Sequence, residues 1–136
     1  WTSYKTTHPA RRPTIDSHGR VWSAHYFGNV ISRIDPATGE VREYELPLKD
    51  GNPYDLWPDA DDNLWVENAI YNSLVKFDQL TEKWTYFPFP ELAAHTPKLD
   101  RSDDGTLWFT LRNEAGPGLA ALKPTGNRPP DAVAGQ

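Results

Sequence analysis

Short runs of alternating hydrophobic and polar residues, separated by turn-forming residues, recur along the chain. The runs 21–24, 30–35 and 41–46 alternate in this way, which predicts β-strands with one face packed against a neighbouring layer. Proline recurs too often for a helical bundle, and no apolar stripe with a 3.6-residue period is present. The pattern therefore predicts an all-β chain of many short strands.

The runs repeat with a period of 43 residues. Trp22, Trp65 and Trp108 follow this spacing, and their strict period favours a structural role in packing one repeat on the next. The same interval relates Gly19/Asp62/Gly105, Val21/Leu64/Leu107, Asn29/Asn72, Asp35/Asp78, Thr38/Thr81, Tyr44/Phe87 and Pro47/Pro90. A period of this size is typical of the four-stranded blade of a β-propeller.

The repeat sets the expected domain boundaries. We expect the last strand of a preceding blade plus a linker at 1–12, blade 1 at 13–47, blade 2 at 48–90, an incomplete blade 3 at 91–124 and a flexible C-terminal tail at 125–136. Three blades do not close a ring, because propellers have about four to eight. The segment is therefore completed either by the remainder of a larger propeller in a longer parent chain or by oligomerisation, as a homodimer in which residues 1–4 of one copy complete the third blade of another.

Charge and composition narrow the classes of partner. The chain carries 14 Lys and Arg against 19 Asp and Glu, and no basic run is longer than Arg11-Arg12. Nucleic acid binding needs clustered positive charge, so nucleic acid is not an expected partner. No apolar run approaches the ~20 residues of a membrane span, so no membrane partner is expected. Without cysteine there are no disulfides and no thiolate metal sites.

The repeat Pro-x-x-Ile/Leu … Asp-Gly-x-Leu-Trp … Asp-Pro-x-Thr-Gly-x-x-x-x-Tyr-x-Leu-Pro resembles the virginiamycin B lyase (streptogramin lyase) family, within a wider group of SMP-30 and gluconolactonase-like propellers. The resemblance covers about residues 1–124. It implies a seven-bladed ring with a central site, a periplasmic or secreted location, and chemistry that uses a divalent metal such as Mg or Ca. Family chemistry also uses histidines in first strands of the Pro-His-Gly-Ile type and a Glu three residues after the blade tryptophan.

The chain departs from the family at both of those positions. The residue after the strand-opening proline of each copy is Thr14, Tyr54 or Lys98, never His. Three residues after each tryptophan stand the residues His25, Asn68 and Leu111, never Glu. Glu67 is one position too early, and alternation sends it to the opposite strand face from a residue at the family position. The lyase signatures are missing from this segment.

One rim of the expected ring gathers polar residues. Loops that join second to third strands, and one blade to the next, lie there and would present His25, Tyr26, Asn52, Tyr54, Asp55, Asn68, Tyr71, His95 and Arg112. Such groups suit a small polar ligand, or they cap strand ends and satisfy loop backbone. His25 and His95 are the candidates for catalysis, because a neutral imidazole can act as a base or a metal ligand.

Three functional hypotheses therefore stay open. The first is a propeller platform that binds a small polar ligand or a protein partner at the channel rim. The second is an enzyme of the lyase or lactonase type with a divalent metal in the central channel. The third is a purely structural extracellular module that acts through multimerisation. The acidic stretches 59–63 and 100–105 resemble the start of a calcium loop, but they lack its final Glu and coincide with hairpin turns. His8, Arg11 and Arg12 are expected to be solvated linker residues.

Overall fold

The computed structural model describes residues 1–89, 96, 98–112 and 117–125 of the chain. These residues form strands and turns only, so the all-β prediction is confirmed. No helix long and apolar enough to cross a bilayer occurs in the described part of the chain.

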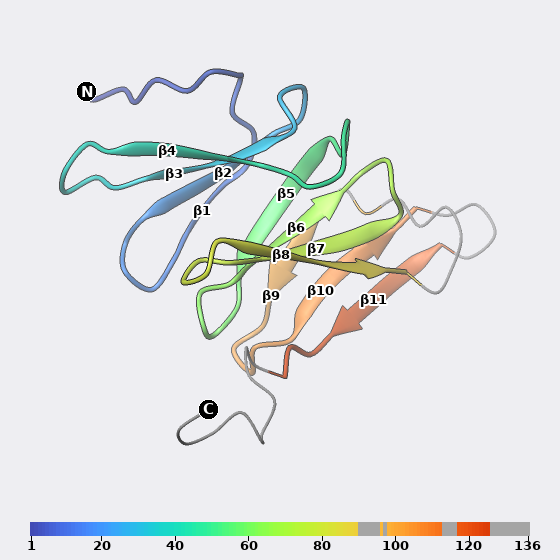
Figure 1. Cartoon of the computed structure of the whole chain (residues 1–136). Helices are drawn as coiled ribbons and strands as arrows, with labels where there is room; N and C mark the ends of the chain where they lie inside the picture. The colour runs from blue at the N-terminus through green and yellow to red at the C-terminus, as the bar shows by residue number, and fades with distance from the viewer. Residues whose placement is uncertain (90–95, 97, 113–116, 126–136) are drawn as a thin grey trace.

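The strands form three antiparallel sheets, which lie side by side as in a segment of a propeller (Figure 1). The first sheet contains β1 (Pro13–Ile15), β2 (Val21–His25), β3 (Val30–Ile34) and β4 (Val41–Glu45). The second contains β5 (Pro53–Pro58), β6 (Leu64–Asn68), β7 (Ser73–Asp78) and β8 (Lys83–Pro88). The third contains β9 (Leu99–Arg101), β10 (Leu107–Leu111) and β11 (Gly118–Leu122). Within each sheet the strands pair in chain order.

The first strand of each sheet lies on the inner side of the arrangement. β5 contacts β1 and β2 of the first sheet and β9 of the third, whereas β4 and β8 are the outer strands of their sheets. The turn between first and second strand needs a left-handed residue in each repeat. Gly19, Asp62 and Gly105 fill that position with φ of 76°, 60° and 84°. Each inner strand begins at one end of the segment, and the turn that leads to the second strand lies at the opposite end.

Two apolar cores lie between successive sheets. Trp22 is buried between the first and second sheets, 6.1 Å from Phe77 between ring centroids. Trp65 is buried between the second and third sheets, 4.9 Å from Phe87. Trp108 holds the equivalent position in the third sheet and is 45% exposed, because no following sheet packs on it in the described part of the chain. Burial of each tryptophan thus depends on the next blade.

Residues 43 positions apart occupy equivalent places in the three inner strands β1, β5 and β9, whereas the prolines at or before these strands do not. Pro13, Leu56 and Leu99 each face the residue that follows the blade tryptophan. Pro53 faces Asn68 instead, and the register shifts between Pro53 and Leu56. Such an irregularity adds residues to one strand without moving the rest of the ladder. Aligning the repeats on their prolines is therefore wrong, and positions before the strand must be compared at the 43-residue spacing.

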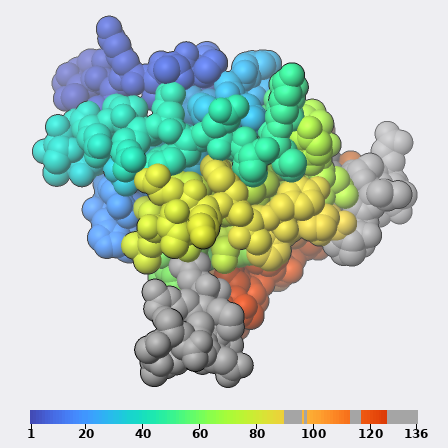
Figure 2. Space-filling view, viewed as in Figure 1, coloured from blue at the N-terminus to red at the C-terminus, as the bar shows by residue number. Residues whose placement is uncertain are grey.

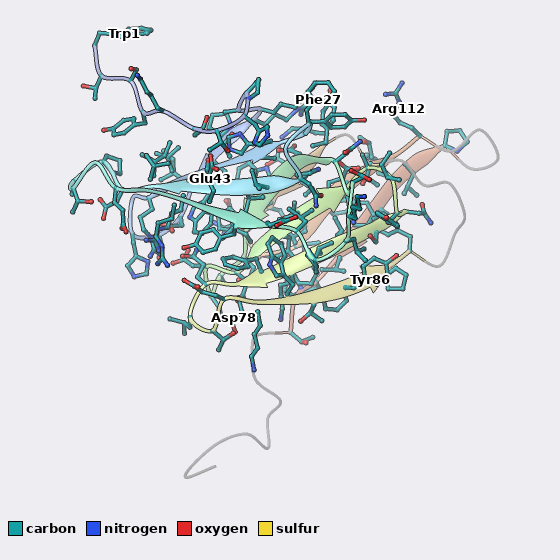
Figure 3. The ribbon with its side chains drawn as sticks, turned by 45° about the horizontal axis from the view of Figure 1, so that its top comes forward. Trp1, Phe27, Glu43, Asp78, Tyr86 and Arg112 are labelled. Atoms are coloured by element: carbon teal, nitrogen blue, oxygen red, sulfur yellow. The ribbon has the colours of Figure 1, made fainter. Side chains whose placement is uncertain are left out.

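The N-terminal segment runs along the first sheet (Figure 2). The Arg11 amide donates to the Ala24 carbonyl at 2.8 Å, and the Thr7 amide donates to the Glu43 carboxylate at 2.8 Å. Residues 1–12 contain no strand. Trp1 projects away from the sheets (Figure 3). The prediction that residues 1–4 act as the last strand of a neighbouring blade stays a prediction.

Candidate functional site

One end of the sheets carries the loops that the sequence assigned to the rim. The inner strands begin there and the second strands end there, so the residues before β1, β5 and β9 meet the residues after β2, β6 and β10. Phe27 and Arg112 lie at this end, and Asp78, the last residue of β7, lies at the opposite end (Figure 3).

A row of alternating charge crosses the rim. Arg12, Asp55 and Lys98 are 43 residues apart, each directly before an in-register inner-strand position. One Asp55 carboxylate oxygen, Oδ2, lies 3.4 Å from the Arg12 guanidinium and 3.6 Å from Lys98 Nζ, and it accepts the Leu99 amide at 3.0 Å. Three consecutive blades are thereby tied together at one level of their inner wall.

A second level of the rim is built from a guanidinium and aromatic rings. Arg11 and Tyr54 also occupy equivalent repeat positions, and the Arg11 guanidinium carbon is 4.8 Å from the Tyr54 ring centroid and 5.0 Å from that of Tyr26. The two tyrosine rings meet edge to face at 5.8 Å. Arg12 adds a contact of 5.3 Å to Tyr54. These distances are in the range of cation–π attraction, which fixes long side chains that would otherwise be mobile.

We call the set Arg11, Arg12, Tyr54, Asp55 and Lys98 the rim cluster. It contains three cations and one carboxylate, whereas the whole chain has a formal net charge of −5. The Asp55 side chain is almost fully buried, while those of Arg12 and Lys98 are 42% and 45% exposed. The cluster therefore presents positive charge to solvent from a chain that is acidic as a whole.

A buried acid lies behind the cluster. Glu67 in β6 is fully buried. Burial raises the pKa of Glu67 to about 8, hydrogen bonds from Thr96 and from the Tyr54 backbone oppose the rise, and the negative charge of Asp55 adds to it. Burial also raises the pKa of Asp55, against the hydrogen bond from the Leu99 amide. Glu67 is therefore mostly protonated at neutral pH and leaves the positive charge of the cluster uncompensated.

Of the two histidine candidates, the structure describes only His25. His25 is fully buried under the N-terminal segment. Its Nδ1 lies 2.8 Å from the His8 carbonyl oxygen, to which it must donate, and its Nε2 lies 2.8 Å from the Ser32 hydroxyl. Both ring nitrogens are therefore engaged, and no part of His25 faces solvent. His95 lies outside the described residues.

The other rim candidates separate into two groups. Tyr26, Tyr54 and Asp55 come together as described above. Asn68 is buried at the end of β6, and the Tyr71 hydroxyl donates to the Lys49 carbonyl at 2.7 Å. Asn52 adopts a left-handed φ of 51°, and Arg112 is exposed and points outward (Figure 3). The Tyr71 hydrogen bond fits the alternative in which rim residues satisfy loop backbone.

Sequence reasoning missed the role of Arg11 and Arg12, which were expected to be solvated. Lys98 was considered only as a departure from the family pattern. The signal was present in the 43-residue spacing, which relates Arg12 to Asp55 and Lys98, and Arg11 to Tyr54. Alignment on the prolines concealed it.

The described residues do not fit a divalent-metal site. No group of three His, Cys, Asp or Glu among them is placed to hold an ion. The Asp59 carboxylate, in one of the calcium-like stretches, accepts the Asn63 amide at 3.0 Å and the Trp65 indole N–H at 2.8 Å. Through these bonds Asp59 stabilises the hairpin turn and also holds the Trp65 side chain in place.

The opposite end of the inner strands holds a cavity of about 540 Å³. Turns from all three sheets line it, and its charged residues are Asp16, Asp59, Asp62, Arg101, Asp103 and Asp104. Asp16 repeats the Asp59 arrangement by accepting the Trp22 indole N–H at 2.9 Å. Asp16 and Asp59, which occupy equivalent repeat positions, thus stabilise turns through their hydrogen bonds.

Comparison with known proteins identifies the fold. No protein-family model and no curated protein matches the sequence. A crystal structure of virginiamycin B lyase from Staphylococcus aureus is similar with a TM-score of 0.71 and 24% identity, over 90% of this chain and 45% of that one. A catalytically inactive form of virginiamycin B lyase from the same species, solved with quinupristin, gives 0.70 and 20%, over 87% and 42%. An extracellular domain from Bacteroides thetaiotaomicron gives 0.64 and 22%, over 84% and 15%.

These similarities show that the chain has the propeller fold found in virginiamycin B lyases, as its repeat predicted. The chain spans less than half the length of the lyases it resembles.

Proposed function

We propose that this chain is part of a propeller platform that binds a small polar ligand at the rim cluster. One observation carries the proposal: equivalent positions of three consecutive blades converge there, with Arg12 and Lys98 on a single Asp55 oxygen. A few convergent polar groups beside aromatic surface are the usual composition of a small-molecule site. Tyr54 and Tyr26 supply that surface, and Arg11 is held against both rings.

The test is a titration of the full chain with a panel of neutral sugars, amino acids and small carboxylates, followed by thermal unfolding. For any panel compound that binds, Tyr54→Ala and Arg11→Gln should each lower the affinity at least tenfold. Tyr86→Ala is the matched control, because Tyr86 is partly exposed on the outer strand β8 and its hydroxyl donates to the Tyr71 carbonyl at 3.1 Å. The absence of any binding, or binding that both rim variants leave unchanged, would overturn the proposal. If the rim binds a protein partner instead of a small ligand, no panel compound is expected to bind.

The fold favours a second candidate, a lyase-type enzyme, because two of the similar structures reported above are virginiamycin B lyases. The described residues do not supply a metal site, so His95 and residues of further blades would have to provide it. The test is incubation of the full-length protein with quinupristin, with and without a chelator. Cleavage that the chelator abolishes would favour this candidate, and an intact substrate would remove it.

We further propose a location outside the cytoplasm. The proposal is supported by the similarity to an extracellular domain of B. thetaiotaomicron and by a second such domain with a TM-score of 0.57. Cell fractionation with an antibody against the native protein tests it, and recovery only in the cytoplasmic fraction would contradict it.

A further inference from the structure

We infer that the rim cluster selects an oxyanion, a carboxylate or phosphate group of the ligand, which Arg12 and Lys98 bind together. This inference rests on the proposed function and names the chemical class of its ligand. Neither the fold nor the similar structures assign a charge to the ligand of this chain, so the inference depends on the charges and the geometry of the cluster.

The first step is the charge balance at the rim. Within the rim cluster, Arg11, Arg12 and Lys98 carry three positive charges and Asp55 carries one negative charge, so these residues have an excess of two positive charges. Glu67 does not reduce the excess at neutral pH, because burial raises its pKa to about 8 and it stays mostly protonated. An anion is therefore attracted, and a cationic ligand is repelled by both exposed side chains.

The second step is the incomplete pairing of the two exposed cations. The distances of 3.4 and 3.6 Å to Asp55 Oδ2 exceed those of strong charge-assisted hydrogen bonds. The same oxygen accepts the Leu99 amide at 3.0 Å, so its capacity is already shared. Lys98 Nζ also donates to the Leu99 carbonyl oxygen at 2.6 Å. A guanidinium has five N–H donors and an ammonium three, so these contacts with described residues do not use all the donors of either group. Donors thus remain on the exposed sides of Arg12 and Lys98.

The third step is the spacing of these donors. Because Arg12 Nη1 and Lys98 Nζ lie close to one carboxylate oxygen, the two nitrogens are within about 7 Å of each other, a span that the oxygens of a single carboxylate or phosphate can bridge. Asp55 thereby positions the two cations for a second anion. It also explains why side chains from different blades point to the same place.

The fourth step is preorganisation by the aromatic rings. Lys98 Nζ lies 5.6 Å from the Trp57 ring centroid, and the Arg12 guanidinium lies 5.3 Å from that of Tyr54. Long cationic side chains lose rotamer entropy when they bind a ligand. Rings that already restrict them lower this cost and so favour binding of a small anion.

The experiment is a titration of the full chain with sodium phosphate and with sodium acetate, at ionic strength held constant with sodium chloride. Binding is followed by NMR shifts of backbone amides and of the indole N–H of Trp57. Arg12→Gln and Lys98→Gln should each weaken phosphate binding at least fivefold. Arg42→Gln is the control, because Arg42 is a similarly exposed arginine that pairs with Glu82 at 3.3 Å in the outer part of the first two sheets. It should leave phosphate binding unchanged.

Glucose serves as the neutral probe that separates this inference from the proposed function. If glucose shifts the rim amides and loses affinity in Tyr54→Ala while neither anion binds, the platform stands and the oxyanion inference is overturned. If neither glucose nor any other panel compound nor either anion binds, both fail. Anion binding that Arg12→Gln and Lys98→Gln leave unchanged is an adventitious ion only, and it also overturns the inference. Circular dichroism of each variant must match that of the wild type, so that loss of folding is not read as loss of a site.

Discussion

Glu67→Gln should remove a pH dependence of stability that is present in the wild-type chain. Burial raises the pKa of the Glu67 carboxyl from 4.5 to about 8 in the folded state. Between these two values the folded state holds a proton that the unfolded state has released. The free energy of unfolding therefore falls as the pH rises through this window, because the unfolded state binds fewer protons.

The size of the effect follows from the two pKa values. At 1.36 kcal/mol per tenfold change, the ionisation of Glu67 lowers the free energy of unfolding by about 3 kcal/mol at pH 7 and by about 5 kcal/mol well above pH 8, relative to acid conditions where both states are protonated. Glutamine has nearly the same shape and does not titrate. The difference in stability between wild type and variant should therefore change by about these amounts across the window.

The assay is urea unfolding at pH values from 5 to 9, followed by circular dichroism. Only the slope of stability against pH is compared, so any constant cost of the amide in place of the acid cancels. Glu45→Gln, at an exposed position of β4, is the control and should follow the wild type. If the Glu67→Gln curve runs parallel to the wild-type curve over the whole range, Glu67 is not held protonated by burial and the reasoning is refuted.

Three further outcomes are expected. Trp65→Ala should lower the free energy of unfolding by about 3–5 kcal/mol, because Trp65 is buried between two sheets. Trp108→Ala should lower it by about half as much, because Trp108 is 45% exposed. Equal losses for the two variants in urea unfolding would contradict this account of the packing. Gly105→Ala should cost about 1 kcal/mol because its φ is 84°, and Gly118→Ala, where an added Cβ meets nothing within 4 Å, should cost nothing by the same assay. Asp55→Asn should strengthen phosphate binding about five- to tenfold, since it removes the negative charge that competes for both rim cations while the amide oxygen can still accept a hydrogen bond from them. Weaker binding would show that the charge of Asp55, and not only its shape, is needed to position the two cations.

The fold could be predicted from the sequence because it is encoded locally and repeatedly. Alternation defines each strand, and a tryptophan every 43 residues marks the same place in each sheet. The exposure of Trp108 could not be read in this way, because the burial of a blade residue depends on the sheet that follows it.

The site was predicted only in part, for reasons that lie in tertiary contacts. Tyr26, Tyr54 and Asp55 were expected at the rim because loop position is set by strand order. The burial of His25 depends on the N-terminal segment crossing the first sheet, which no periodicity reports. Arg12 became part of the site because its long side chain reaches the inner strand of the next blade.

The register of the inner strands has a consequence for how such a molecule can diversify. Arg12, Asp55 and Lys98 occupy the same position in three successive repeats. The backbone hydrogen bonds that fix this position do not depend on which side chain is present there. Exchange of one of these side chains changes the charge of the set and leaves the strand pairing in place. The set of side chains at this level of the three sheets can therefore vary while the strand pairing that positions it stays the same.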